Sequence, residues 1–431
     1  MKGLVLAAGE GVRLHPLTLT RSKHMLPVGG KPILEHVLLA LSKAGIDDIG
    51  IVVGYRRELI QSRLGDGSKF GIRLSYIVQE QATGTAGAIG LANRFVGDEK
   101  FFVTYGDLCL GSDSVRRVIN ASKNHAEDVT LAVLPVLNPE IYGVVKLEGK
   151  RMMDLIEKPS ADAVHSNLAN AGLYVFSPRI FEAIQETALS SRGEFEITDS
   201  VRLLIQGGCP VSAVEISSSD WLDVGRPWDL LDANQRYLSM MAHHVEGNIE
   251  DNVYVKGNLH LGKDSTLRSG TYIEGPVFIG EKCDVGPNAY MRPSTSIGNN
   301  VRVGSCCEIK SSIIFDRTQI PHLSYVGDSV IGENCNLGAG TKTANLRHDG
   351  KPVFMEIKGI RVNSGRRKLG TVMGDNVKTG VNVTILPGVK IGPGSWINAH
   401  QIVSRDVPAE SLLTGTVTQD LQELPSDRSQ G

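Results

Sequence analysis

An apolar residue recurs at every sixth position through much of the second half of the chain. The run has eleven members: Ile249, Val255, Leu261, Leu267, Ile273, Ile279, Val285, Met291, Ile297, Val303 and Ile309. A helix repeats every 3.6 residues and a strand every two, so a spacing of six fits neither. It is typical of a triangular parallel β-helix, in which each side of a prism is one short strand and a turn. The aliphatic side chains then point into the prism axis, and stacked coils share one continuous core.

Glycine follows many of these apolar residues. The pairs are Leu261-Gly262, Ile279-Gly280, Val285-Gly286, Ile297-Gly298 and Val303-Gly304. We expect these glycines at corners of the prism, where a side chain would be crowded. After one-residue slips the period continues, stops in a charged stretch at 344–371 that we interpret as a loop leaving the prism, and then returns; the later members are Ile320, Val326, Ile331, Leu337, Met373, Thr379, Ile385, Ile391, Ile397 and Val403. An ordinary β-sandwich would show period-two alternation and variable turns instead.

Residues 1–226 have a different pattern. Short β-rich runs such as KGLVLAA, DIGIVVGY and FFVTYGD are separated by helical patterns such as PILEHVLLALSKAG and SVRRVINASKNH. This alternation predicts a mostly parallel, Rossmann-like α/β sheet with helices on both faces. We therefore divide the chain into an α/β domain (1–226), a connecting helix that begins at Pro227 (227–247), a left-handed parallel β-helix (248–410) and a polar C-terminal tail (411–431).

Charge and cysteine usage narrow the function classes. The 45 Lys and Arg residues nearly balance the 47 Asp and Glu residues, which leaves a net charge of -2. That balance removes the electrostatic motive for nucleic-acid or membrane-surface binding, and no apolar run reaches the roughly 18 residues of a membrane span. We interpret the N-terminus as a first strand, not a signal peptide. The six cysteines have no CxxC spacing, which favours a reduced, cytoplasmic setting.

A glycine-rich turn follows the first expected strand, within the run Leu6-Ala7-Ala8-Gly9-Glu10-Gly11-Val12-Arg13-Leu14. Such a turn exposes backbone N–H groups that suit a phosphate chain. It is not the dinucleotide-binding fingerprint, because the GxGxxG spacing is absent. Arg13 within the run and Lys23 ten residues later place two cations near the turn. Taken alone, a tight strand-to-helix loop with two solvated charges would explain the same residues.

This turn, the following Lys-x-Met-Leu-Pro-Val and several later motifs resemble the sugar-1-phosphate nucleotidylyltransferase family. The similarity runs in order through residues 1–226, with Ser22 as a departure where family members usually have proline. The resemblance implies that the nucleotide is bound by Ala8, Gly9, Gly11, Gln79, Gly84 and Thr85. It implies that the sugar phosphate is bound by Tyr105, Gly106, Gly143, Glu157, Lys158 and Asn170.

The family reaction explains why the charged residues are needed. A sugar phosphate oxygen attacks the α-phosphorus of a nucleoside triphosphate, and pyrophosphate leaves, so two anions must be held together. The resemblance assigns Mg²⁺ to Asp107 and Asp223, which are hard oxygen ligands. It assigns Arg13 to the departing phosphates and Lys23 to the α-phosphate or the sugar phosphate. Gln79 and Ala8 favour a pyrimidine, but UTP and dTTP are not distinguished.

Polar residues lie among the periodic aliphatic residues in successive coils of the expected β-helix. Their order resembles the acetyltransferase half of the bifunctional N-acetylglucosamine-1-phosphate uridylyltransferase/glucosamine-1-phosphate acetyltransferase family, in a form closest to its archaeal members. That resemblance makes His322 the catalytic base and Ala339 and Ala399 the small residues beside acetyl-CoA. It places the acetyl acceptor against Arg292, Lys310, Tyr325, Asn336, Asn345 and Lys351.

The acetyl acceptor must lose a proton before it attacks the thioester. Histidine has an ordinary pKa of about 6.5, so His322 suits this role near neutral pH. The resemblance also implies a homotrimer, because the family builds this site between neighbouring chains. The basic segment 365–370 is longer than in bacterial members, so glucosamine-1-phosphate and galactosamine-1-phosphate both stay open as acceptors.

Three functional hypotheses follow. The first is a bifunctional enzyme that acetylates an amino-sugar-1-phosphate and transfers a nucleotidyl group from UTP or dTTP to a sugar-1-phosphate. The second is a glucose-1-phosphate nucleotidylyltransferase alone, with the β-helix as an assembly scaffold. The third is a non-catalytic regulator with the same layout, which predicts loss of the charged set. We favour the first hypothesis, because the charged residues are intact and the β-helix carries an ordered polar set.

Overall fold

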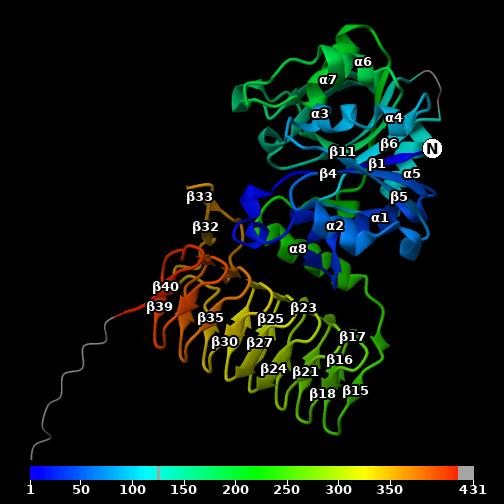
Figure 1. Ribbon diagram of the computed structural model, residues 1–431. Helices are drawn as coiled ribbons and strands as arrows, with labels where there is room; N and C mark the ends of the chain where they lie inside the picture. The colour runs from blue at the N-terminus through cyan, green and yellow to red at the C-terminus, as the bar shows by residue number, and fades with distance from the viewer. Residues whose placement is uncertain (124–126, 416–431) are drawn as a thin grey trace, which may run out of the picture.

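Two architectures follow one another in the computed structural model, which describes residues 1–123 and 127–415 (Figure 1). The first is a nine-stranded mixed sheet in the order β5-β4-β1-β6-β11-β8-β12-β10-β9. Its strands are β1 (Gly3–Ala7), β4 (Asp48–Val53), β5 (Arg73–Val78), β6 (Phe101–Tyr105), β8 (Val129–Pro135), β9 (Gly143–Glu148), β10 (Arg151–Glu157), β11 (Leu168–Phe176) and β12 (Val211–Glu215). The β5-β4-β1-β6 part is parallel, whereas β11 runs antiparallel to both β6 and β8.

Helices cover both faces of this sheet. Alternate residues of β1 enter different cores: Val5 and Ala7 pack with Leu34 and Leu38 of α1, whereas Leu4 and Leu6 pack in the second core. This is the pattern expected of a strand buried on both sides. The helices of this half are α1 (Ile33–Lys43), α2 (Arg57–Leu64), α3 (Thr85–Gly90), α4 (Asn93–Val96), α5 (Ser112–Ala121), α6 (Ile180–Glu186) and α7 (Ile197–Gln206). In the described residues no helix is long and apolar enough to cross a membrane.

Short elements surround the strand ends of the sheet. Two small antiparallel ribbons pair β2 (Pro27–Val28) with β3 (Lys31–Pro32), and β7 (Leu108–Leu110) with β13 (Trp221–Asp223). The 3-10 helices are η1 (Val12–Leu14), η2 (Leu17–Leu19), η3 (Lys23–Met25), η4 (Ser68–Phe70), η5 (Pro139–Ile141), η6 (Ala161–Ala163) and η7 (Ser218–Asp220). Helix α8 (Pro227–Ser239) then connects the two halves, with Pro227 at its first position.

The second half is the parallel β-helix that the six-residue period predicts. Its first sheet contains β14 (His244–Val245), β17 (Leu259–Leu261), β20 (Val277–Ile279), β23 (Thr295–Ile297), β26 (Ile313–Ile314), β29 (Val330–Ile331), β34 (Val372–Met373) and β37 (Lys390–Ile391). Its second contains β15 (Asn248–Ile249), β18 (Thr266–Leu267), β21 (Asp284–Val285), β24 (Arg302–Ser305), β27 (Gln319–His322), β30 (Asn336–Leu337), β35 (Lys378–Thr379), β38 (Trp396–Ile397) and β40 (Leu412–Leu413). Its third contains β16 (Tyr254–Lys256), β19 (Tyr272–Glu274), β22 (Tyr290–Met291), β25 (Glu308–Lys310), β28 (Tyr325–Gly327), β31 (Lys342–Thr343), β36 (Thr384–Ile385) and β39 (Ile402–Val403).

The periodic aliphatic residues form the axis of this prism. From Leu261 to Ile309 every member of the run is fully buried, and the members share one core. Ile249 is 40% exposed, because it lies in the first coil and no coil covers it from below. The predicted tail at 411–431 begins with β40, which adds to the second sheet, and its remainder after residue 415 lies outside the described residues.

Two different positions shape the corners that follow strands β17, β20 and β23 of the first sheet. A Cβ on Gly262 would lie 2.6 Å from the backbone of Gly280 in the next coil, so crowding requires glycine after the aliphatic residue. The left-handed backbone lies two residues further on, at Asp264, Lys282 and Asn300, with φ between 55° and 59°. These positions are not glycine; Asp264 and Asn300 are of the residue types that adopt the left-handed conformation most readily after glycine.

The N-terminal half lies along the first sheet of the β-helix. Asn234 of α8 accepts a hydrogen bond from the Gly29 N–H (2.8 Å) and donates to the carbonyl of Ser294 (2.9 Å). Further along, Arg21 forms ion pairs with Glu333 (2.9 Å) and Asp375 (2.5 Å). A buried apolar cluster between these polar contacts includes Leu14, Leu17, Val224, Trp228, Phe315, Met355 and Val372. Both halves therefore contribute to one continuous interface.

The predicted loop at 344–371 contains a hairpin. Its strands are β32 (Phe354–Ile357) and β33 (Ile360–Asn363), joined by Lys358 and Gly359. In Figure 1 the hairpin stands out from the side of the β-helix toward the N-terminal half.

Candidate functional site

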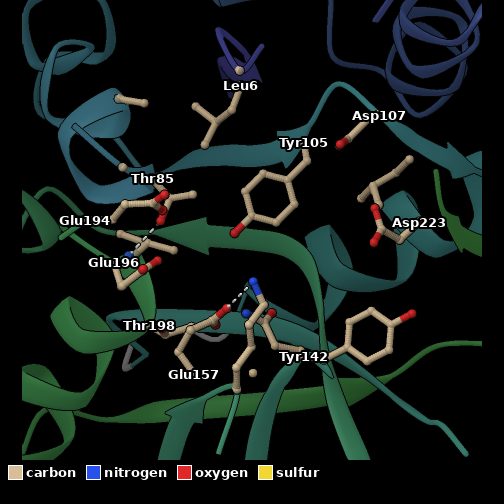
Figure 2. A pocket seen from close by; sticks show the side chains of 18 of the residues that line it. Leu6, Thr85, Tyr105, Asp107, Tyr142, Glu157, Glu194, Glu196, Thr198 and Asp223 are labelled. Atoms are coloured by element: carbon tan, nitrogen blue, oxygen red, sulfur yellow. Dashed lines mark hydrogen bonds and ion pairs between the residues drawn. The ribbon is translucent and has the colours of Figure 1, made fainter. Parts of the chain in front are cut away.

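A cavity of about 530 Å³ opens beside the sheet of the N-terminal half. Its wall begins at the end of β1 and includes residues that follow β5 and β6 as well as residues of β10, β11 and β13. Figure 2 shows Asp107 and Asp223 together at one end and Thr85, Glu194 and Glu196 at the other, with Tyr105 between them. The cavity thus has an acidic end near the glycine-rich turn and a second polar end near α3.

The glycine-rich turn and the two predicted cations form one unit. Ala8, Gly9, Arg13 and Lys23 line the cavity, whereas Gly11 lies behind Lys23, and a Cβ on Gly11 would come within 2.8 Å of the Lys23 Cβ. Gly11 also has φ of 75°, which favours glycine. The turn must therefore be free of side chains for Lys23 to cross it.

Ser22 fixes the orientation of Lys23. The Ser22 hydroxyl is fully buried, caps η3 and lies 2.9 Å from Nδ1 of His24. Burial, and then the Lys23 charge, lower the pKa of His24 to about 3, so this ring is neutral. Serine thus replaces the stiffness of the family proline with a buried hydrogen-bond network.

The two predicted metal ligands lie side by side, although they are far apart along the chain. Asp223 ends β13, where it pairs with Leu108 of β7, and the Val224 N–H donates to the carbonyl of Asp107 (3.1 Å). The Lys23 ammonium forms an ion pair with the Asp107 carboxylate. Both carboxylates line the cavity.

The electrostatics of this pair fit a divalent cation. Burial, the largest single contribution, would raise the pKa of Asp107, but the charge and hydrogen bond of Lys23 together with the electrostatic effects of His24 and Arg13 outweigh it, so the pKa of Asp107 is lowered. Burial and the Asp107 charge raise the pKa of Asp223. A cation between the two oxygens would relieve this repulsion, and Mg²⁺ suits two carboxylates because its other positions are filled by water and substrate phosphates. No group of three or more potential ligands gathers within residues 1–123 and 127–415.

Most of the predicted sugar-phosphate residues line one side of the cavity. Gly143, Glu157, Lys158 and Asn170 all line it, and burial raises the pKa of Glu157. The Asn170 amide donates to the Tyr174 hydroxyl (2.6 Å), which holds the side chain in place. Tyr105 lines the cavity as well.

Gly106 does not line the cavity. Its backbone bonds to Leu6, and a Cβ there would come within 3.0 Å of the His24 ring. Tyr105 and Asp107 face the cavity on either side of it, so the chain alternates here as an extended segment does. Gly106 is therefore a spacer that lets His24 pack below the two cavity residues.

The other predicted nucleotide residues, Gln79, Gly84 and Thr85, lie near the end of the cavity opposite the acids. Gln79 is buried after β5, and its amide donates to the Thr83 hydroxyl (3.2 Å). Gly84 has φ of 98°, and a Cβ there would come within 2.5 Å of the carbonyl of Phe195. The Ile197 N–H donates to the Thr85 hydroxyl (2.9 Å), so this turn is bound to the first residue of α7. All three residues line the cavity.

Several lining residues were not predicted from the sequence. Arg192, Glu194 and Glu196 come from the segment between α6 and α7, Thr198 comes from the first turn of α7, and Lys358 comes from the hairpin of the β-helix half. The run Glu194-Phe195-Glu196-Ile197-Thr198 gave a usable signal, since alternating polar residues just before a helix indicate an exposed edge. Lys358 lies in a basic stretch and has no comparable local signal.

The third sheet of the β-helix brings several of the predicted acetyl-acceptor residues together. Lys310 in β25 forms an ion pair with Asp328 (2.8 Å), and Asp328 also accepts from the Asn345 amide (2.6 Å). The same amide donates to the Tyr325 hydroxyl (3.0 Å). Arg292, one strand away, forms an ion pair with Glu308 (2.8 Å). Three residues predicted from separate coils therefore share one hydrogen-bonded network, with Arg292 beside it.

His322 lies at a corner between the second and third sheets, exposed, and heads a column that runs along the prism. Backbone hydrogen bonds connect Gly340 to His322, Asn382 to Ala339 and His400 to Val381 (3.2, 2.8 and 2.8 Å). These bonds and the strand register place Ala339 in the coil after His322 and Ala399 two coils beyond it. The base and the two small residues therefore share one edge.

Two predicted residues lie apart from this edge and network. Asn336 pairs with Gln319, three residues before His322 on the same strand, so it is displaced along the second sheet. Lys351 is exposed in the loop, where its N–H donates to Asp349 (3.2 Å), and no hydrogen bond among the described residues connects it to the network. One chain therefore assembles only part of the predicted acetyl site.

Known protein families match both halves of this geometry. Residues 2–240 match the family model described as nucleotidyl transferase. The chain belongs to this nucleotidyl transferase family. Residues 273–386, within the β-helix, match a model described as the GMPPB C-terminal domain.

Full-length relatives combine the two halves. The chain is 42% identical over 414 residues to the bifunctional protein GlmU of Methanococcus maripaludis (strain S2), which covers 96% of this chain and 97% of the relative. It is 40% identical over 411 residues to a bifunctional sugar-1-phosphate nucleotidylyltransferase/acetyltransferase of Sulfurisphaera tokodaii, covering 94% and 98%. A solved chain from Bacillus anthracis, provisionally named a glucose-1-phosphate thymidylyltransferase, matches 54% of this chain and 94% of its own length with a TM-score of 0.50 and 35% identity.

Proposed function

We propose that this chain is a bifunctional enzyme that makes nucleotide-activated N-acetyl amino sugars. It transfers an acetyl group from acetyl-CoA to glucosamine-1-phosphate or galactosamine-1-phosphate. It then transfers a uridylyl or thymidylyl group from UTP or dTTP to the sugar-1-phosphate, with release of pyrophosphate. The observation that carries the first activity is the convergence of Asp107, Asp223, Arg13 and Lys23 on one cavity. Similarity to bifunctional relatives over nearly the whole chain supports both activities.

Nucleotidyl transfer would proceed by positioning and charge neutralisation. The sugar phosphate oxygen attacks the α-phosphorus in line with the leaving pyrophosphate, so both anions must be fixed near each other. Arg13 would neutralise the departing phosphates, and Lys23 would move from Asp107 to the reacting phosphate. Glu157 and Asn170 would hold sugar hydroxyls. Mg²⁺ held by Asp107 and Asp223 would supply the divalent charge for the triphosphate.

Acetyl transfer would use the corner of the β-helix. His322 would take the ammonium proton of the acceptor, so that the neutral amine attacks the thioester and coenzyme A leaves as the thiol. Arg292 and Lys310 would bind the 1-phosphate, which requires them to exchange Glu308 and Asp328 for the substrate. Ala339 and Ala399 would leave room for the pantetheine arm.

Assembly and location complete the proposal. We propose a cytoplasmic homotrimer, because a site open along one prism edge needs a neighbouring chain to close it. Asn336 and Lys351, which lie apart from the network within one chain, would then act with residues of an adjacent copy. Neither nucleic acid nor a membrane is expected as a partner, given the net charge of -2.

Two sets of variants test the two activities separately. Asp107→Ala and Asp223→Ala should each abolish Mg²⁺-dependent pyrophosphate release, with a loss on the order of 10²–10³ or more, while acetyl transfer continues. His322→Ala should do the reverse, as measured by thiol release from acetyl-CoA with glucosamine-1-phosphate. Near-normal pyrophosphate release in both acid variants would refute the first site, and near-normal thiol release in His322→Ala would refute the second. A panel of four sugar phosphates against four triphosphates would identify the substrates.

A further inference from the structure

The hairpin of the β-helix half extends into the nucleotidyl transfer cavity. Among the lining residues that the structure describes, Lys358 alone comes from beyond α8. It lies at the hairpin turn, between Ile357 and Ile360, which pair across the two strands. Lys358 and Gly359 have φ of 51° and 76°, as a two-residue type I′ turn requires. The turn therefore presents a lysine side chain at a position where the backbone favours Gly or Asn.

The hairpin is held against both halves of the molecule. Val353, Met355 and Ile357 alternate along one face and are buried in the interdomain cluster. At the base of the hairpin, Arg366 forms an ion pair with Asp232 of α8. Ser364 donates through its N–H to the Val353 carbonyl (3.1 Å). These contacts distinguish the hairpin from a free surface loop.

The same cluster determines where the turn arrives. Its members Leu14 and Val224 directly follow Arg13 and Asp223 in the sequence, and both of these neighbours line the cavity. A hairpin buried in the same cluster as Leu14 and Val224 therefore approaches the cavity from its acidic, glycine-turn end. This is the end assigned to the metal and the triphosphate, whereas the sugar is assigned to Glu157 and Asn170.

Most cations of the cavity already have carboxylate partners. Lys23 is paired with Asp107, Lys158 lies 3.7 Å from Glu157, and Arg192 is paired with Glu196. Among the described lining residues, Arg13 and Lys358 are the lysine and arginine side chains without an ion pair to a carboxylate. Two unpaired cations in a cavity with buried acids leave positive charge available for an anionic ligand.

We propose that Lys358 binds the polyphosphate of the nucleoside triphosphate, so that the β-helix half completes the nucleotide site of its own chain. The inference rests on the proposed nucleotidyl transfer. Lys358 would contact the β- or γ-phosphate together with Arg13 and would remain with pyrophosphate until release. No bond to Lys358 forms or breaks. It is a binding residue supplied by the second half of the chain.

The test uses Lys358→Asn in the full-length protein, because asparagine keeps the left-handed turn and removes the charge. We expect KM for UTP and the inhibition constant of pyrophosphate to rise about 10-fold, with KM for the sugar phosphate and the acetyl transfer rate unchanged. Lys358→Arg should restore both constants. The matched control is Arg361→Asn, an exposed cation of the same hairpin that contacts the Phe354 ring and does not line the cavity.

The outcomes separate this inference from the proposed function. If the wild-type protein releases no pyrophosphate with any substrate pair, the proposed function fails. If the wild type is active and Lys358→Asn retains its constants for UTP and pyrophosphate, the role of Lys358 is refuted. A rise confined to KM for the sugar phosphate would also refute the polyphosphate assignment. Equal effects in Lys358→Asn and Arg361→Asn would show a general disturbance of the hairpin and overturn the specific contact.

Discussion

Arg21 connects the N-terminal half to the distal part of the β-helix through two ion pairs, and Arg21→Met should loosen that attachment. Its side chain is 15% exposed, and its guanidinium pairs with Asp375 (8% exposed) and Glu333 (24% exposed). The guanidinium also lies 4.9 Å from the Phe315 ring. Methionine keeps the apolar contact with this ring and removes the charge from both carboxylates.

The size of the effect follows from what each carboxylate retains. Breaking a buried ion pair by removing one partner costs about 3–5 kcal/mol. Asp375 still accepts hydrogen bonds from the Thr20 hydroxyl (2.6 Å) and the Glu333 N–H (2.7 Å), and Glu333 still pairs with Arg317. We therefore expect the free energy of unfolding to fall by less than that range, about 2–3 kcal/mol.

Urea unfolding followed by tryptophan fluorescence can measure this loss. The chain has three tryptophans, and a Trp396→Phe background leaves only Trp221 and Trp228, both of which report on the N-terminal half. Arg317→Met is the matched control, because Arg317 pairs with the same Glu333 but is 60% exposed and lies within the β-helix. The control should lose less than about 1 kcal/mol. A difference between the two variants below about 0.5 kcal/mol would refute the reasoning, since that is the scatter of ordinary surface substitutions.

Three further outcomes are expected. Gly304→Ala places a Cβ 1.9 Å from the Pro321 carbonyl oxygen and should destabilise the β-helix by about 1–3 kcal/mol, as measured by thermal unfolding. Gly207→Ala is the control and should not destabilise the protein, because Gly207 has φ of -73° and its nearest contact is at 3.4 Å. Equal losses of stability in the two variants would contradict the crowding argument. Burial lowers the pKa of His36 to about 4, so the folded state disfavours protonation of this ring. The free energy of unfolding should therefore fall by about 2 kcal/mol between about pH 7.5 and pH 5 because of this group. His36→Gln should remove that part of the pH dependence. An unchanged slope in His36→Gln would show that other groups control it. Chelation by EDTA should stop pyrophosphate release and leave thiol release from acetyl-CoA intact, because Asp107 and Asp223 are the pair proposed to hold the metal, whereas the Glu308 and Asp328 carboxylates of the second site are each paired with a cation. Loss of both activities would count against that separation.

The β-helix could be predicted because its pattern is local and repeated. Each aliphatic residue from Leu261 to Ile309 faces the axis for the same reason, so the sequence spacing carries the packing directly. The first strand and its glycine-rich turn could also be predicted, because an apolar run followed directly by glycines is typical of a buried strand that ends in a tight turn. The left-handed corner positions, such as Asp264, were not predicted, because asparagine, aspartate, lysine and serine there form no single-residue pattern.

The candidate site was predicted less completely, because it depends on contacts between distant segments. The proximity of Asp107 and Asp223 is predicted from the sequence only through the family resemblance, because it depends on the pairing of β7 with β13. Gly106 is predicted as a sugar-phosphate residue but does not line the cavity, in keeping with period-two alternation beside Tyr105. Lys358 could not be found, since its position depends on how the two halves dock.

The first sheet of the β-helix contacts the N-terminal half at regularly spaced positions. Phe278, Ser296, Phe315, Glu333 and Asp375 contact the N-terminal half and lie in or just after β20, β23, β26, β29 and β34, five neighbouring strands of one sheet. Each coil advances the prism by about 4.8 Å, so these anchor points are separated by whole multiples of that step. A coil inserted between these contact residues would move Asp375 out of reach of Arg21. A coil added after β37 would lengthen the prism without changing the contacts between the two halves. Chain length in this protein can therefore vary at the far end of the prism but is fixed between the anchors.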